Sequence, residues 1–221
     1  MYRLVKRFFD IVFSLIGLIL LSPLLVPVII ILALTGEHEI FYFQKRIGYK
    51  NREFNIWKFA TMLKNSASIG TGVITLRNDP RVTPFGKFLR ISKINELPQL
   101  INVLLGDMSL VGARPLMKKS FDHYPDDVKT VVYNTPPGIT GIGSVIFRDE
   151  EKIISDSSDI EATYRGIFSY KGELEKWYQR NISFYTDFMI LFLTGWHIFF
   201  STSNLVYKVF PTLPKGSLAG S

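Results

Sequence analysis

Residues 85–116 read FGKFLRISKINELPQLINVLLGDMSLVGARPL, and this stretch decides the fold. Apolar residues recur in it at steps of three and four, which predicts an amphipathic helix. Those residues are Leu97, Leu100, Ile101, Leu104 and Leu105. Asn95 is expected to cap the start of the helix, and Gly106 to follow its end. We therefore predict a helix from about Glu96 to Leu105, with Pro98 in its first turn.

An anion site is predicted at the start of this helix, because unpaired N–H groups and the helix dipole favour negative charge there. Arg90 precedes the helix and Arg114 follows it, so we expect two guanidinium groups to converge on a phosphate. Glu96 and Asp107 add carboxylates, which suit a magnesium-dependent phosphoryl site. The simpler alternative is that Asn95 is only a cap, Glu96 only a first-turn charge and Asp107 only a turn former.

The segment NELPQLINVLLGDMSLVGARP resembles the signature of the bacterial sugar transferase family, the monotopic phosphoglycosyltransferases. Members of that family transfer a sugar 1-phosphate from a UDP-sugar to polyprenol phosphate, with Mg²⁺, at the cytoplasmic face of the bacterial inner (plasma) membrane. The resemblance implies a UDP-sugar, polyprenol phosphate and anionic membrane lipid as partners. It also implies a helix-rich, mixed α/β monotopic membrane protein with an N-terminal re-entrant helix, a small β-hairpin and interfacial amphipathic helices.

The expected organisation has three parts. Residues 1–36 are predicted to form the re-entrant anchor, and residues 37–215 a cytosolic phosphoglycosyltransferase domain with a membrane-interfacial C-terminal helix. Residues 216–221 resemble an artificial linker and are left out of the prediction. A homo-oligomer is left open.

Charge and composition agree with a membrane partner. The chain has 221 residues, 47% of them hydrophobic, a net charge of +7 and no cysteine, which excludes disulfides and thiolate metal sites. The net charge alone allows nucleic acid, an anionic bilayer or a phosphorylated substrate as partner. Arg3, Lys6 and Arg7 directly precede an apolar run, and no nucleic-acid motif is visible, so we favour anionic lipid and expect no nucleic acid.

Residues 11–35 carry no charge and are long enough to cross a bilayer. Pro23 and Pro27 lie near the middle and are expected to bend the helix. Basic residues flank both ends, which favours placing both on the cytoplasmic side, although prolines occur in spanning helices too. Residue patterns alone leave the two topologies open. The resemblance favours the re-entrant form, because Asp10, Ser22 and Pro23 match the family's anchor.

A hairpin is predicted from the β-prone segments 40–43 and 54–59, which flank the turn-rich residues 48–52. Gln44, Arg46 and Gly48 match one family segment, and Lys58 lies in another. By resemblance Lys58 is expected to contact phosphate. Ala60 stands where many members have arginine.

Further candidates follow the central stretch. The turn at residues 135–141 matches an element associated with the nucleotide-sugar, which implies a substrate role for Gly138, although Pro136 replaces the usual arginine. Arg148 is a candidate for another substrate contact. Residues 161–180 are predicted to form an amphipathic helix, facing either lipid or solvent. We expect the apolar run 184–207 to lie at the membrane interface.

Position 95 departs from the family in the feature that bears on catalysis. In the family, the aspartate of an Asp-Glu pair is the nucleophile, whereas this chain has Asn95 followed by Glu96. A carboxamide is a poor nucleophile that is not activated by deprotonation near neutral pH. Three explanations stay open: Glu96 acts as nucleophile or base in an altered or direct transfer, the protein binds polyprenol phosphate or a pathway partner without turnover, or an aspartate was deliberately replaced. Asn95 and Glu96 are the catalytic candidates, and Glu96 is also the predicted magnesium ligand.

Overall fold

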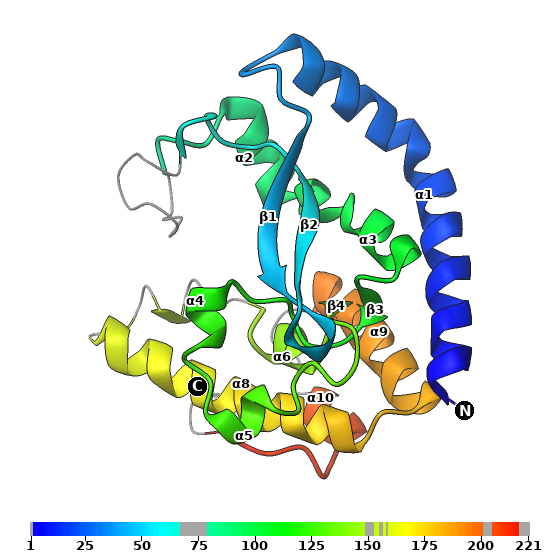
Figure 1. Ribbon diagram of the computed structural model, residues 1–221, viewed down its shortest axis with the longest axis vertical. Helices are drawn as coiled ribbons and strands as arrows, with labels where there is room; N and C mark the ends of the chain where they lie inside the picture. The colour runs from blue at the N-terminus through cyan, green and yellow to red at the C-terminus, as the bar shows by residue number, and fades with distance from the viewer. Residues whose placement is uncertain are drawn as a thin grey trace.

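The computed structural model describes residues 2–66, 79–148, 153–154, 157, 159–200 and 205–216. Its long helices lie near the two ends of the chain, and short elements lie between them (Figure 1). The elements are α1 (Tyr2–Leu34), β1 (Phe41–Ile47), η1 (Tyr49–Asn51), β2 (Glu53–Phe59), α2 (Pro84–Ile91), η3 (Ile94–Glu96), α3 (Gln99–Leu105), β3 (Ser109–Val111), α4 (Lys118–Phe121), α5 (Asp126–Lys129), β4 (Gly138–Thr140), α6 (Ile142–Ile146), α8 (Ile160–Arg180), α9 (Phe184–Phe199) and α10 (Leu205–Val209). The prediction of a helix-rich, mixed α/β chain is confirmed.

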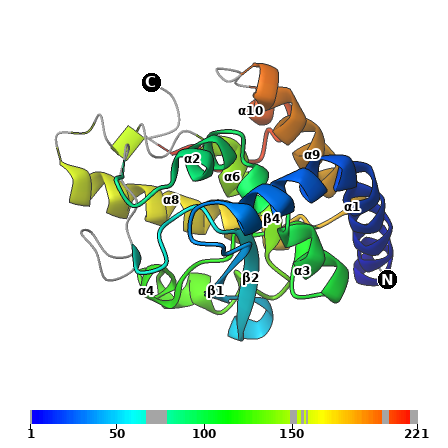
Figure 2. The same cartoon turned by 90° about the horizontal axis from the view of Figure 1, so that it is seen from above.

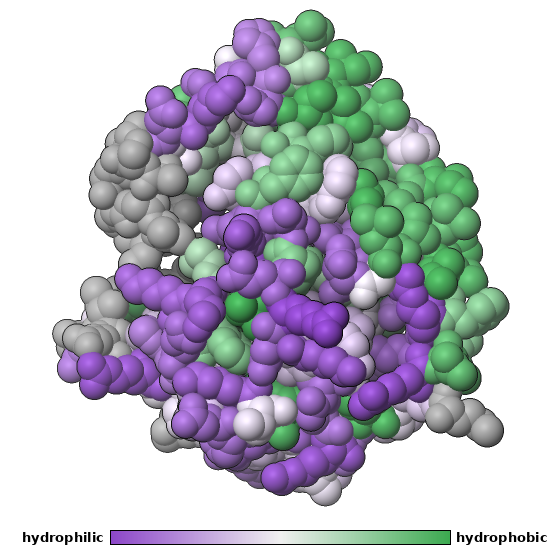
Figure 3. All heavy atoms as spheres, in the orientation of Figure 1, coloured by the Kyte–Doolittle hydropathy of each residue, from purple (hydrophilic) through white to green (hydrophobic). Residues whose placement is uncertain are grey.

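Helix α1 has 33 residues and continues through Pro23 and Pro27. Figure 1 shows it curving around one edge of the molecule, so the expected break at Ser22 and Pro23 is a bend within one helix. Each proline removes only one backbone donor, and neighbouring turns keep their hydrogen bonds. By length and composition α1 is apolar enough to cross a membrane. Most of its apolar side chains are exposed and form the green edge in Figure 3.

Buried charges attach the first half of α1 to the rest of the protein. Asp10 accepts two hydrogen bonds from β3, at 2.9 and 3.1 Å. Lys6 donates to a backbone carbonyl of β3 at 2.8 Å and pairs with Asp187 of α9 at 2.5 Å. Residues four positions apart share one helix face, which is why both charges meet the same strand.

Arg7 binds the end of another helix. Its guanidinium donates to the backbone carbonyls of Val103 and Leu104, at 2.5 and 2.8 Å, beside the predicted end of α3 at Gly106. A cation stabilises a helix C-terminus, where carbonyls lack intrahelical partners. The expected attraction of the N-terminal basic residues Arg3, Lys6 and Arg7 to anionic lipid stays a prediction, although two of them have partners within the protein. Lys6 and Arg7 are used within the protein, and Arg3 is exposed.

The predicted hairpin is confirmed and extends further than expected along its first strand. β1 and β2 pair antiparallel, with Tyr42 opposite Lys58 and Arg46 opposite Phe54. Side chains alternate between the two faces of a strand, so Tyr42, Gln44, Arg46 and Lys58 share one face. The other face is aromatic, and its Phe59 packs with the second half of α1.

The largest core cluster lies where α6, α8 and α9 pack beside the parallel pair β3 and β4. Figure 2 shows the N-terminal half of α1 at one edge of the molecule, beside α3 and α9, while its C-terminal half crosses over the middle and α8 lies beneath the short elements. The predicted helix 161–180 is confirmed as α8. Its Lys176 side chain is only 16% exposed and pairs with Asp127 at 2.7 Å and Glu173 at 2.6 Å, so this lysine is used within the protein.

The apolar run 184–207 does not form one helix. α9 ends at Phe199, and α10 begins at Leu205. One face of α9 is buried, including Asp187 and His197, while aromatic side chains such as Phe188 on the other face are exposed. The expected interfacial position of α9 stays a prediction.

The helix predicted from Glu96 starts later, at Gln99. Asn95 lies in the 3-10 turn η3, and its side chain forms no cap. The backbone hydrogen bonds around Pro98 span three residues, including one from Leu100 N–H to the Leu97 carbonyl at 3.0 Å. The α-helical pattern begins only after Pro98.

Two smaller expectations have mixed outcomes. Gly106 ends α3 with φ +98°, a left-handed conformation that glycine adopts without strain. The linker expected at residues 216–221 lies outside the described residues except for Gly216.

Candidate functional site

A carboxylate and two cations meet where the hairpin, η3 and the turn after β3 come together. Glu96 Oε1 accepts hydrogen bonds from Lys58 Nζ at 3.1 Å and Arg114 Nη2 at 2.8 Å. The Lys58 and Glu96 side chains are 15% and 19% exposed, and Arg114 is 48% exposed. The structure therefore brings together three residues predicted from sequence, with Arg114 on the open side.

Arg46 is a fourth member of this cluster that the predicted site did not include. Its guanidinium donates to Gln44 Oε1 at 2.5 Å, and its Nε is buried without a hydrogen-bond partner. The charge of Arg114 lowers the pKa of Arg46 and the charge of Glu96 raises it, so Arg46 interacts electrostatically with both residues. The alternation of β1 offered the signal, because it places Arg46 and Lys58 on the same hairpin face. We call Arg46, Lys58, Glu96 and Arg114 the basic cluster; three cations surround one carboxylate.

The shifted pKa values follow from this crowding. Burial lowers the pKa of Lys58 to about 8, because the attraction of Glu96 does not offset burial and the repulsion from Arg114 and Arg46. Burial and the charge of Arg114 lower the pKa of Arg46 to about 10. Burial on its own would raise the pKa of Glu96, but Arg114 and Lys58 outweigh it and hold this pKa well below its usual range. Glu96 is therefore ionised at neutral pH and is a weak base.

Asn95 and Gln99 place unsatisfied polar atoms on neighbouring turns. Asn95 Oδ1 and Gln99 Nε2 are both buried and have no hydrogen-bond partner among the described residues. Gln99, which is 2% exposed, was not among the predicted site residues. Buried polar atoms normally find partners, so this segment has unused hydrogen-bonding capacity next to Glu96.

The structure does not join Arg90 or Arg148 to the basic cluster. The Arg90 side chain, on α2, forms no hydrogen bond or ion pair with the described residues. Arg148 is exposed just after α6, beside residues 149–152, which are not described. Asp107 lies beyond the opposite end of α3 from Glu96, where it accepts a hydrogen bond from Asn102 at 3.4 Å. The substrate roles of Arg90 and Arg148 stay predictions.

Gly138 has a packing reason to be glycine. A Cβ there would lie 2.1 Å from the backbone nitrogen of Gly112, because β3 and β4 approach closely at this point. The Gly138 N–H donates to the carbonyl of Ala113 at 2.9 Å, directly before Arg114. Gly138 thus helps to position the segment after β3 that carries Arg114, and its substrate contact stays a prediction.

The magnesium prediction depends on Glu96. Among the residues that the structure describes, no group of three His, Cys, Asp or Glu side chains could hold a metal ion. Mg²⁺ is commonly held by one or two carboxylates together with substrate phosphates and water. Lys58 and Arg114 both pair with Oε1 of Glu96, whereas no ion pair with a residue that the structure describes involves its Oε2. A single carboxylate suits Mg²⁺ only when a diphosphate supplies further oxygen ligands.

The chain belongs to the bacterial sugar transferase family, whose model matches residues 1–201. Among curated proteins, it is 34% identical to the undecaprenyl-phosphate galactose phosphotransferase of Salmonella typhimurium, over 87% of this chain and 40% of that protein. It is 33% identical to the UDP-N-acetylgalactosamine-undecaprenyl-phosphate N-acetylgalactosaminephosphotransferase of Aeromonas hydrophila, over 87% of this chain and 43% of the relative.

A relative of more similar length is the exopolysaccharide production protein ExoY of Rhizobium meliloti. It is 30% identical over 86% of this chain and 83% of that protein. By contrast, the chain spans about two fifths of the Salmonella and Aeromonas proteins. Membership in the family is therefore established for this chain. The activities of the longer relatives are only proposed for it.

Proposed function

We propose that this chain transfers a sugar 1-phosphate from a UDP-sugar to polyprenol phosphate. The observation that carries the proposal is the basic cluster, in which Arg46, Lys58 and Arg114 surround the single carboxylate of Glu96. Three cations and one carboxylate give the cluster a net charge of about +2, which suits a diphosphate substrate. The named activities of the Salmonella and Aeromonas relatives support the same reaction.

The proposed reaction is a single displacement. A phosphate oxygen of polyprenol phosphate attacks the sugar-bearing phosphorus, the bond from that phosphorus to the bridging oxygen breaks, and UMP leaves with the bonding electrons. The acceptor phosphate is already an anion at neutral pH, so its attack requires no protein base. This route suits Asn95, a poor nucleophile, and Glu96, which the neighbouring cations make a weak base.

Each residue has a defined part in this proposal. Lys58 and Arg114 bind the diphosphate and stabilise the charge that develops on the transferring group, with Arg46 adding positive potential behind them. Glu96 positions Lys58 and Arg114. When bound with substrate, Mg²⁺ would share the Glu96 carboxylate and neutralise phosphate charge. Arg90, Gly138 and Arg148 are proposed as outer contacts to the UDP-sugar.

The proposed location is the cytoplasmic face of a bacterial inner membrane, with α1 re-entrant. Both halves of α1 contact the same folded body, through Lys6 and Asp10 near the start and Leu32 near the end. A helix crossing to the opposite leaflet would carry one of these contact regions away from that body. The bend at Pro23 and Pro27 and the exposed apolar face of α1 support an anchor that enters and leaves on one side.

A direct assay tests the proposed reaction. Purified chain in detergent is incubated with polyprenol phosphate, Mg²⁺ and a panel of UDP-sugars, and UMP release is measured. We expect UMP only when acceptor and one matching UDP-sugar are both present. Arg114→Met should reduce the rate strongly, whereas Arg3→Met, a change at an exposed arginine outside the cluster, should not.

A second function, binding without turnover, is favoured by Asn95. If the panel yields no UMP while the chain still binds polyprenol phosphate, and Asn95→Asp produces UMP release, the natural role is binding. If neither the native chain nor Asn95→Asp releases UMP with any UDP-sugar, the transferase proposal is contradicted. The proposal of a binding protein that lost its nucleophile is then contradicted too.

A further inference from the structure

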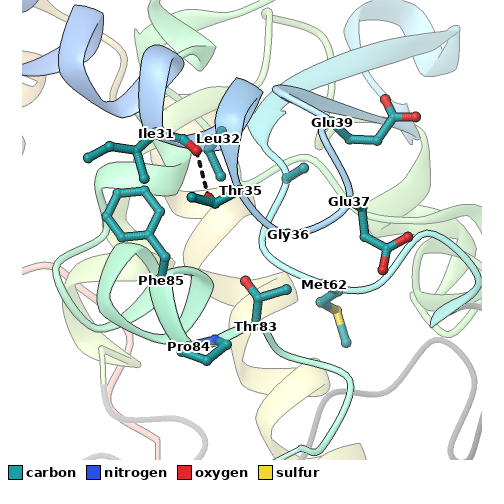
Figure 4. A pocket seen from close by; sticks show the side chains of 11 residues that line it. Ile31, Leu32, Thr35, Gly36, Glu37, Glu39, Met62, Thr83, Pro84 and Phe85 are labelled. Atoms are coloured by element: carbon teal, nitrogen blue, oxygen red, sulfur yellow. Dashed lines mark hydrogen bonds between the residues drawn. The ribbon is translucent and has the colours of Figure 1, made fainter.

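A pocket of about 320 Å³ lies between the end of α1, the segment after β2 and the start of α2 (Figure 4). Its apolar lining includes Ile31, Leu32, Met62 and Phe85, and its polar lining includes Glu37 and Glu39. None of the four residues of the basic cluster lines it. The pocket is therefore separate from the proposed transfer site.

Apolar residues from the end of α1 and the start of α2 lie opposite the two glutamates. Figure 4 shows Ile31 and Phe85 on one side, while the carboxylates of Glu37 and Glu39 lie on the other side, beyond Gly36, with Met62 below Glu37. Thr35 lies between them, and its hydroxyl already donates to the Ile31 carbonyl at 2.6 Å. A molecule that is apolar at one end and cationic at the other matches this arrangement.

The acidic side also contains one cation. Glu39 pairs with Lys64 at 2.7 Å, and both side chains are largely exposed, at 46% and 67%. Glu37 forms no ion pair with the described residues. Two carboxylates and one ammonium group complement a zwitterion, whose cation would meet Glu37 and Glu39 while its anion meets Lys64.

The apolar side of the pocket continues into the anchor. Ile31 and Leu32 belong to the last turns of α1, and Ile30, Ile31 and Leu34 are exposed there. In the proposed membrane placement, this is where the chain leaves the hydrocarbon. A lipid chain beside α1 would thus bring its own headgroup to Glu37 and Glu39.

We infer that this pocket binds a phospholipid with a primary ammonium headgroup, such as phosphatidylethanolamine. This inference rests on the proposed membrane placement of α1, but not on the transfer reaction. A primary ammonium donates hydrogen bonds to carboxylates, whereas a trimethylammonium group has no N–H to donate. An anionic glycerol headgroup would meet two like charges. The site should therefore prefer ethanolamine to choline and glycerol headgroups.

Native mass spectrometry of the full chain in detergent tests this preference. Phosphatidylethanolamine, phosphatidylcholine and phosphatidylglycerol with identical acyl chains are titrated separately, and bound lipid is counted. We expect half-saturation with the ethanolamine lipid at about fivefold lower concentration than with either other lipid. The double change Glu37→Gln and Glu39→Gln should remove the difference.

Glu53→Gln is the matched control, because Glu53 also pairs with an exposed lysine, Lys45, at 3.5 Å but does not line the pocket. It should leave the preference intact. Ala60→Arg, at the pocket wall, adds bulk and a fixed cation and should weaken ethanolamine lipid binding without removing either carboxylate.

Equal half-saturation by the three lipids overturns the inference, and so does a preference that survives the double glutamate change. If a tetralysine peptide binds through the two glutamates and no lipid preference exists, the occupant is a basic polypeptide and the lipid inference is wrong. Lack of UMP release with the ethanolamine preference present would instead contradict only the transfer reaction.

Discussion

Lys6 in α1 and Asp187 in α9 form a buried ion pair at 2.5 Å although 181 positions separate them in the sequence. The hydroxyls of Tyr2 and Tyr178 also donate to Asp187, at 2.6 and 2.7 Å, so both carboxylate oxygens have partners. This pair fixes the start of the anchor to the C-terminal part of the fold. It makes the attachment of α1 sensitive to single substitutions far from α1.

Asp187→Asn should destabilise the protein by about 3–5 kcal/mol, because it removes the carboxylate that pairs directly with the buried Lys6 ammonium. The measurement is urea unfolding in detergent, followed by tryptophan fluorescence. Asp122→Asn is the control, since it breaks an exposed pair with Lys118 and should cost at most about 0.5 kcal/mol. Equal losses of unfolding free energy in the two variants would mean that the buried Lys6–Asp187 pair stabilises the protein no more than the exposed pair does.

Gly138→Ala should cost several kcal/mol or prevent folding, because its Cβ would collide with the backbone of Gly112. Thermal unfolding checks this expectation. Gly195→Ala, inside α9, is the control: its added Cβ meets nothing within 4 Å and should gain about 0.5–1 kcal/mol in helix stability. A mild effect at Gly138 would contradict the close approach of β3 and β4.

Lys58 should make UDP-sugar binding depend on pH near neutrality. Lysine is charged below its pKa and neutral above it, so with a pKa of about 8 the affinity should fall as pH rises through 8. Calorimetric titrations between about pH 7 and 9 measure this fall. Lys58→Arg keeps the charge throughout that range and should flatten the profile. A native profile that is already flat to pH 9 would rule out Lys58 as the titrating phosphate ligand.

Glu96→Gln should separate the two effects of the central carboxylate. Removing its charge leaves Lys58 and Arg114 without a counter-ion, so stability should fall by about 1–3 kcal/mol. The same change raises the net positive charge, so affinity for UMP should persist or increase. Unfolding and UMP titrations are compared with Glu53→Gln, an exposed control whose effects should be small. Loss of UMP binding with unchanged stability would show that Glu96 contacts the ligand directly.

Isotope exchange between labelled UMP and UDP-sugar, without polyprenol phosphate, should distinguish the two chemical routes. Exchange requires a phosphosugar bound covalently to the enzyme, and the Asn95 carboxamide gives no such intermediate. We expect none in the native chain, whereas Asn95→Asp should acquire exchange. Asn55→Asp, a matched change on the hairpin, should not. Exchange in the native chain would contradict single displacement and identify another nucleophile.

The sequence by itself determined the local elements and the members of the site that lie in continuous motifs. Two β-prone segments flanking a turn-rich stretch predicted the hairpin, and helical spacing predicted α8, because both patterns depend on neighbouring positions. The motifs also identified Lys58, Glu96 and Arg114, which the structure joins through Glu96 Oε1. The family followed from the same residues.

Only the tertiary structure decided which charges bind the protein itself. From sequence, Lys6 and Arg7 belong to a basic group expected to attract anionic lipid, whereas in the structure they bind Asp187 and the end of α3. Arg46 belongs to the site only because the folded hairpin places it close to Glu96 and Arg114. Asn95 is not a cap, because it lies in the 3-10 turn η3 and α3 begins only after Pro98. The partners of Lys6, Arg7 and Arg46 are distant in sequence, so residue spacing does not reveal them. The conformation at Asn95 depends on the competition between a 3-10 turn and an α-helix, which residue spacing does not decide either.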